Sequence, residues 1–263
     1  MTDYRIAVVE DAINVLEAFL PAERPLSLAE LTEQTGLVKN KVFRILATLQ
    51  AHGFVTRNEQ GTYSLGLRMV EFGESVRRRD AIVQAAAPVM DWLVEETRET
   101  IFLGVVDGLE VLVLAARESP QSVRLFGAVG RRAPIHTGGI PKVLLAFLPH
   151  SERSAILDQI SLDPITPYTY TDRAKLEAFL DEIRARGYVV TADDLDVGAV
   201  SIAAPIRDYS GRVVAAMSVA GPLSRMPEAT TRTYTDLILK GAARISQALG
   251  YRQIHATAAS IAA

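Results

Sequence analysis

Two helix-boundary signals near the amino end constrain the fold most strongly. Ser27 and Glu30 have the spacing of a capping box, in which the serine side chain accepts from the Glu30 N–H and the glutamate side chain accepts from the Ser27 N–H. Gly36 can adopt the left-handed conformation that ends a helix. The sequence therefore predicts a short helix between these signals, with Leu28 and Leu31 on its apolar side.

A second helix is predicted directly after the glycine turn. Its apolar residues have the spacing of one buried stripe: Val42, Ile45, Leu46 and Leu49. Four polar residues lie outside that stripe: Lys39, Asn40, Lys41 and Arg44. A short helix, a glycine turn and a second helix with a basic outer side are typical of a helix-turn-helix that reads the DNA major groove. Asn and Arg can bond base edges there, and lysines can contact phosphates.

Further elements complete a winged domain over residues 1–66. Two alternating segments at 53–57 and 62–65 are predicted to pair as a hairpin wing, with Arg57 placed to contact the DNA backbone. Ahead of the motif, a third helix is predicted to end before Pro21 and to bury one apolar stripe: Ala12, Ile13, Leu16, Phe19 and Leu20.

Positive charge is confined to this motif. Residues 36–68 hold five basic side chains against Glu59 alone, whereas residues 1–35 hold two basic side chains against seven acidic ones. Because the 263-residue chain has a formal net charge of −3, any DNA binding must come from a confined patch rather than from a generally basic surface. A cationic helix side is also often merely solvated, so the motif alone leaves a structural role open.

Composition excludes several other classes. The chain is 49% hydrophobic and has no cysteine, which removes disulfide frameworks and thiolate metal sites. No apolar run approaches the roughly 20 residues that span a bilayer, and the amino end lacks the apolar core of a secretory signal. We therefore expect a cytoplasmic protein with no membrane contact, no cofactor and no metal.

The remainder is predicted to comprise a linker helix at 67–79, a second domain at 80–250 and an alanine-rich tail at 251–263. Three arginines, 77–79, end the linker and fit either phosphate contacts or a solvated connector. In the second domain, the helix at 82–96 contains Pro88, which must bend it or split it in two.

Hairpin signals dominate the second domain. Asp107-Gly108 separates predicted strands at 100–106 and 110–115. Further strands are predicted at 123–126, 188–191, 200–206 and 213–220, and helices at 141–148, 152–160, 172–186 and 234–249. The predicted fold class is therefore α+β: an N-terminal winged helix-turn-helix, then a mainly antiparallel sheet with flanking helices.

These segments together resemble transcriptional regulators of the isocitrate lyase regulator (IclR) type. The matching stretches are 26–31, 36–49, 63–66, 134–137, 142–149, 186–188, 201–206 and 218–222. Because they are independent and occur in the family's order, the resemblance is specific. It implies a homodimer or homotetramer that binds double-stranded operator DNA. It also implies that a GAF-like second domain binds a small-molecule effector, often an organic or aromatic acid of carbon catabolism.

The resemblance places an effector pocket at seven positions: Gly139, Ile140, Asp193, Asp194, Ser201, Ser218 and Ala220. Pro141 suits the first position of a helix, which would leave the N–H groups of Lys142 and Val143 free to meet a carboxylate. Alternatively, the glycines at 138–139 form a plain turn, and the acidic loop at 193–196 is merely solvated.

Four positions depart from the family's pattern. Pro141 stands where glycine is common and removes a backbone donor, and Ala220 replaces a frequent serine, which points to a less polar effector. Asp11 stands where arginine is frequent, and Lys41 replaces a small hydroxyl residue. The expected DNA contacts are Lys39, Asn40, Lys41, Arg44 and Arg57.

Two other functional classes remain as alternatives. An architectural DNA-binding protein without a ligand would have a solid second domain, whereas a sensor would have an apolar cavity with a few hydroxyl groups. An enzyme would need a catalytic constellation, but the sequence has no nucleophile elbow, P-loop or dinucleotide-binding glycine motif. The four histidines lack metal-ligand spacing: His52, His136, His150 and His255. We therefore predict no catalytic residues.

Overall fold

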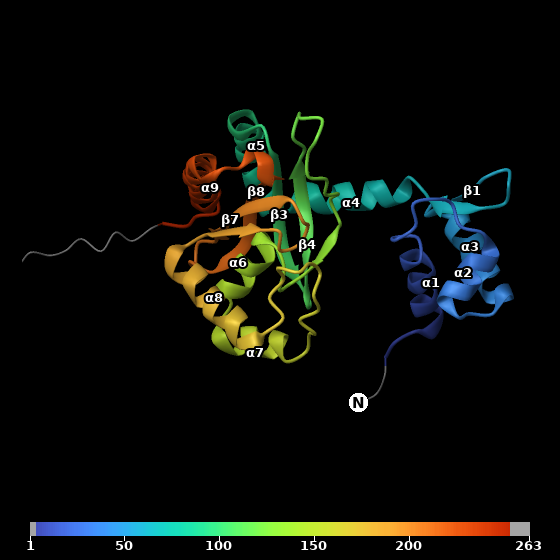
Figure 1. Cartoon of the computed structure of the whole chain (residues 1–263). Helices are drawn as coiled ribbons and strands as arrows, with labels where there is room; N and C mark the ends of the chain where they lie inside the picture. Colours follow the sequence, from blue (N-terminus) through green and yellow to red (C-terminus); the bar gives the residue numbers. More distant parts are fainter. Residues whose placement is uncertain (1–3, 253–263) are drawn as a thin grey trace, which may run out of the picture. The chain divides into compact units, whose positions relative to one another are not determined.

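The computed structural model describes residues 4–252, and the chain divides into two compact units between Arg79 and Asp80 (Figure 1). Most of the predicted tail, including His255, lies outside the described residues. Within those residues, no helix combines the length and the apolar character needed to cross a membrane.

In its described residues, the amino-terminal unit begins with three helices and a two-stranded wing, which confirm the winged helix-turn-helix, and ends with a fourth helix. The elements of the winged helix-turn-helix are α1 (Ala7–Glu17), α2 (Leu28–Thr35), α3 (Lys39–Ala51), β1 (Val55–Arg57) and β2 (Tyr63–Leu65). Both bonds of the predicted capping box are present at Ser27 and Glu30. Gly36 ends α2 in the left-handed conformation, at φ 65°. These local signals therefore set the turn between α2 and α3.

One apolar core joins α1, α2, α3 and the wing. Its buried side chains include Val15, Leu31 and Leu46. Two residues of the predicted α1 stripe, Ile13 and Leu20, are instead exposed. Ile13 lies within α1 but off its buried side, which runs through Val15. Leu20 lies beyond the end of α1 at Glu17, whereas Phe19 is buried in the core as predicted.

Helix α4 (Arg68–Arg79) follows the wing and buries no residue in this chain. Phe72 packs against Phe54 with ring centroids 5.4 Å apart, whereas Val70 and Val76 are exposed. The arginines at 77–79 form the last turn of α4, where cations suit the negative end of the helix dipole.

The second unit is built on a six-stranded antiparallel sheet in the order β5-β4-β3-β8-β7-β6, which confirms the α+β class. Its strands are β3 (Thr100–Asp107), β4 (Glu110–Arg117), β5 (Arg132–Pro134), β6 (Val189–Ala192), β7 (Ala199–Arg207) and β8 (Val213–Pro222). The strand predicted at 123–126 is wrong. Val123 and Phe126 are exposed in a loop, and β5 takes the edge position because residues 132–134 pair with 110–112 of β4.

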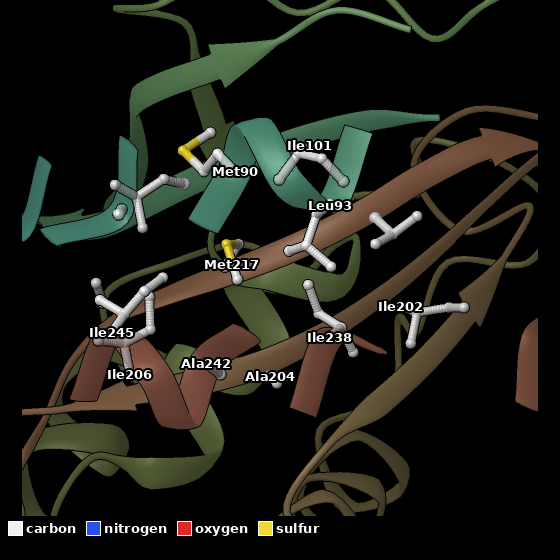
Figure 2. Packing of buried hydrophobic residues seen from close by; sticks show 14 of the residues in the cluster. Met90, Leu93, Ile101, Ile202, Ala204, Ile206, Met217, Ile238, Ala242 and Ile245 are labelled. Carbon is white, nitrogen blue, oxygen red and sulfur yellow. The ribbon is translucent and has the colours of Figure 1, made fainter. Parts of the chain in front are cut away.

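Helices cover both faces of this sheet (Figure 1). Helices α5 (Ala81–Thr97) and α9 (Glu228–Ala248) pack on one face, and α6 (Gly139–Phe147) and α8 (Arg173–Arg186) pack on the other. Alternation along β8 sends Met217 toward α5 and α9 (Figure 2) and Ala216 toward α6. Two further elements are α7 (His150–Leu157) and the 3-10 turn η1 (Leu223–Arg225).

Helix α5 runs without interruption past Pro88, so the predicted possibility of a split helix is wrong. Proline removes one backbone hydrogen bond from a helix interior. Ala86 before it and Met90 and Leu93 after it are all buried in the same core. Packing on both sides of the proline therefore outweighs the lost bond.

Candidate functional site

The outer side of α3 exposes the polar residues that the sequence singled out. Val42, Ile45 and Leu46 are buried, which leaves Asn40 and Arg44 on the opposite, exposed side. Lys39 is also exposed at the first turn. A recognition helix requires this division, with an apolar side held by the core and a hydrogen-bonding side free for bases.

Lys41 has a partner that the sequence did not reveal. Its ammonium forms an ion pair with the carboxylate of Asp11 on α1, and the two side chains are 41% and 14% exposed. These are the two positions of the winged domain that depart from the family's pattern, and they compensate each other's charge. Because the pair is neutral, Lys39 and Arg44 provide the net positive charge of this side of α3.

Arg57 is held at the hairpin wing. Its guanidinium lies over the Tyr63 ring, 5.4 Å from the ring centroid, and its Nε donates to the Gly61 carbonyl at 3.4 Å. The side chain remains exposed. The wing therefore presents an oriented cation that can contact a phosphate.

The second unit contains a cavity of about 110 Å³ between the start of α6, the sheet and two loops. Most of its wall is apolar and includes Phe102, Val111 and Leu125. Six of the seven predicted effector residues line it: Gly139, Ile140, Asp194, Ser201, Ser218 and Ala220. Asp193 does not; its carboxylate accepts from the Gly198 N–H and closes the loop.

The serines reach the cavity because of the sheet register. Ser201 on β7 pairs with Ala220 on β8, and Ser218 pairs with Ala203, so these side chains share the α6 face of the sheet. Ser218 is 2% exposed, and both serines belong to the lining of the cavity. A serine hydroxyl can both donate and accept a hydrogen bond, so these groups are suited to bind a ligand's polar atoms.

Helix α6 begins at Gly139, earlier than the predicted start at Pro141. Its first N–H groups, which have no acceptor inside a helix, therefore belong to Gly139 and Ile140 and not to Lys142 and Val143. A Cβ atom at Gly139 would lie 2.6 Å from Ser201 Oγ, so only glycine permits this close approach. The positive end of the α6 dipole thus lies at the cavity.

A buried ion pair supports the cavity wall. The Lys142 ammonium is buried and donates to Asp194 Oδ2 at 2.5 Å, and the Gly138 N–H donates to the same oxygen. The Lys142 Nζ also lies 4.8 Å from the centroid of the Tyr170 ring. Burial lowers the pKa of Lys142, and the charge of Asp194 opposes this shift.

Asp194 is buried beside the cavity. The residue is 5% exposed, so the alternative of a merely solvated loop is wrong for Asp194. Asp196 is exposed and also lines the cavity. Within residues 4–252, Asp194 Oδ1 is buried without a hydrogen-bond partner. A ligand hydroxyl or amine could donate to it.

Sequence reasoning missed three residues of this region. Phe102 lines the cavity, but it lies opposite Ser218 only through the pairing of β3 with β8, which the sequence does not give. Lys142 could have been suspected of burial from the apolar residues on both sides of it. Arg131 also lines the cavity, but it lies in a loop where no sequence period indicates direction.

Comparison with known proteins covers both units. The IclR helix-turn-helix domain matches residues 8–59, and the C-terminal domain of the bacterial transcriptional regulator IclR matches residues 74–247. The chain is 37% identical over 226 residues to the HTH-type transcriptional regulator KipR of Bacillus subtilis, covering 86% of this chain and 90% of KipR. It is 31% identical over 247 residues to XynR of Escherichia coli, covering 94% and 98% of the two chains.

Solved structures show the same relationship. IclR of Thermotoga maritima matches with a TM-score of 0.78 and 28% identity. The match covers 94% of this chain and 100% of the Thermotoga maritima chain. An IclR homolog from Microbacterium hydrocarbonoxydans, complexed with 4-hydroxybenzoate, matches with a TM-score of 0.81 and 27% identity, over 92% and 98% of the two chains.

The matches extend through both the DNA-binding motif and the domain that contains the cavity, in the same order. The relatives are transcriptional regulators, which excludes the enzyme alternative. With an exposed recognition helix in one unit and a largely apolar cavity in the other, the chain belongs to the IclR family of DNA-binding bacterial transcriptional regulators.

Proposed function

We propose that this protein controls genes for the catabolism of a small aromatic acid and that this acid is its effector. The cavity carries the proposal, because it combines apolar walls with a few convergent polar groups. A solid second domain would have favoured a purely architectural role. Operator binding would take place in the cytoplasm, where bacterial DNA lies.

The cavity's dimensions favour a ligand with a single ring. An engineered apolar cavity of roughly 150 Å³ in another protein accommodates benzene, and the volume here is about 110 Å³ before any adjustment of the walls. Ala220 lines the cavity where the family often has a serine, so this wall is better matched to a ring than to a hydroxyl-rich chain.

The polar groups favour an acid that also carries a donor. The N–H groups of Gly139 and Ile140 at the start of α6 suit a carboxylate, and Asp194 Oδ1 suits a hydroxyl or amine hydrogen. A relative complexed with 4-hydroxybenzoate has both groups on one ring, which supports extending this ligand class to the present protein.

Replacing Ser218 by leucine is expected to abolish the ligand response without loss of DNA binding. The added side chain would fill space beside β3 and remove the buried hydroxyl. A thermal-shift screen of benzoate, 4-hydroxybenzoate and short-chain acids measures this, because a ligand that binds the native state raises its apparent stability. Gel shifts with and without the stabilising acid then measure operator affinity.

Thr233→Leu is a matched control, because Thr233 is exposed on α9 and lies outside the cavity. It should respond to the acid as the unmodified protein does. If Ser218→Leu kept the same thermal shift, the effector would bind elsewhere. A ligand can change operator affinity only if it binds the DNA-competent and the DNA-incompetent arrangements of the protein with different affinities. A thermal shift caused by the acid without any change in operator affinity would therefore contradict effector control.

We further propose that the protein is a homodimer or a homotetramer and that α4 contributes to the contact between copies. No residue of α4 is buried within the described chain, although Val70, Phe72 and Val76 expose apolar area. A second copy of the same helix would cover this area and would place two recognition helices on one palindromic operator.

The double variant Val70→Glu/Val76→Glu is expected to dissociate the assembly, because each change puts a charge on an exposed apolar side chain of α4. Sedimentation velocity would show the loss of the oligomer, and the affinity for a palindromic site would fall toward that for a half-site. Arg78→Glu on the same helix changes charge without removing apolar area and is the control. An unchanged sedimentation coefficient in the double variant would exclude α4 from the interface.

A further inference from the structure

Helix α3 carries a large apolar side chain on its outer side. Residues 40, 43, 44 and 47 share that side by helical spacing, and Phe43 among them is 48% exposed. Phe43 belongs neither to the core of the amino-terminal unit nor to the partly buried side chains packed on it. Val38, which precedes the first turn of α3, is 71% exposed. Folding therefore leaves two apolar side chains near Asn40.

We propose that Phe43 is a specificity-determining residue that recognises thymine through its C5 methyl group. Thymine is the one base that presents an apolar group in the major groove, so a phenyl ring can distinguish it without a hydrogen bond. Residues three and four positions apart are neighbours on a helix surface, so Phe43 would read a base pair beside those that Asn40 and Arg44 contact. This inference rests on the DNA-binding function.

The charge around Phe43 favours duplex DNA as the occupant of this surface. Lys39 and Arg44 are exposed on the same helix, and the sequence of α3 contains no acidic residue. Lys41 is neutralised by Asp11, which leaves a basic surface with an apolar side chain within it. Two copies of this chain that met here would bring like charges together, whereas DNA phosphates would neutralise them.

The test begins with selection of duplexes from a random library by the full-length protein. Each thymine of the enriched site is then replaced in turn by deoxyuridine, which removes only the C5 methyl. At one position in each half-site, we expect the affinity of the unmodified protein to fall by about fourfold, the effect of returning one methyl group to water. Phe43→Ala is expected to bind the thymine and uracil sites equally.

Two further measurements separate the explanations. Phe43→Leu keeps an apolar contact and should retain part of the thymine preference, and both variants should unfold at the unmodified protein's temperature because Phe43 is outside the core. Equal uracil sensitivity in the unmodified protein and in Phe43→Ala would overturn the inference while leaving DNA binding intact. Loss of the oligomer in Phe43→Ala would assign this surface to a second copy instead and also overturn it. Failure to enrich any sequence would overturn specific DNA binding itself.

Discussion

Lys142→Met is expected to lower the free energy of unfolding of the second unit by about 3–5 kcal/mol, the usual effect of leaving one charge of a buried pair uncompensated. Both partners are enclosed: Lys142 has no exposed surface and Asp194 is 5% exposed. Methionine fills a similar volume, so the loss would come from the Asp194 charge rather than from a cavity. Trp92, the one tryptophan of the chain, packs against the core of this unit and reports its unfolding in urea by fluorescence.

Two controls identify the cause. Lys142→Met/Asp194→Asn removes both charges and keeps an oxygen that can accept from the Gly138 N–H, so it should recover most of the stability. Arg186→Met breaks an exposed pair with Glu182 on α8 and should cost less than about 1 kcal/mol. A loss of less than about 1 kcal/mol in Lys142→Met itself would mean that the buried pair does not determine the stability of the cavity wall.

Arg44→Ala is expected to weaken binding to the selected operator by about 1–3 kcal/mol, the usual discrimination of one bidentate base contact. Asn40→Ala should weaken it similarly and relax the preference at one base pair, because Asn can bond an adenine edge in two places. Both side chains are exposed on α3 and outside the core, so neither change should alter the unfolding temperature. Fluorescence anisotropy with the selected and a scrambled duplex, over a range of salt concentrations, measures both effects.

The ion pair between Lys41 and Asp11 supplies the matched control. The double variant Asp11→Asn/Lys41→Met removes a neutral pair from the same surface and should change the salt dependence of binding less than Arg44→Ala does, since that dependence follows the phosphates neutralised by free cations. Unchanged binding in both Arg44→Ala and Asn40→Ala would show that another surface of the amino-terminal unit contacts the bases.

Signals contained in a few neighbouring residues predicted the structure well. The capping box at Ser27 and the left-handed Gly36 both appear as expected, and so do the hairpin at Asp107-Gly108 and the antiparallel sheet. Such signals depend on hydrogen bonds and backbone conformations within a single turn of chain. Predictions failed where the structure depends on residues far apart in the chain. The segment at 123–126 has residues typical of a strand, but it forms no strand because no neighbouring strand pairs with it.

The resemblance to a known family contributed most at the cavity. It named Ser201, Ser218 and Ala220, which residue-by-residue reasoning could not bring together, because they are neighbours only through the pairing of β7 with β8. It also named Asp193, which lies outside the cavity lining. The boundary between pocket and loop thus falls between two adjacent aspartates, the first of which, Asp193, adopts the left-handed conformation at φ 60°.

The sequence by itself determined most of the segments that become helices and strands, where the recognition helix begins and which of its sides is apolar, because these properties arise from contacts within a few residues along the chain. Only the tertiary structure decided that Lys142 and Asp194 form a buried pair, that Lys41 is neutralised by Asp11, and that Ser218 lies in the wall of a cavity. Each of these depends on residues from different elements, and a sequence period gives the side of an element on which a residue lies but not what that side meets.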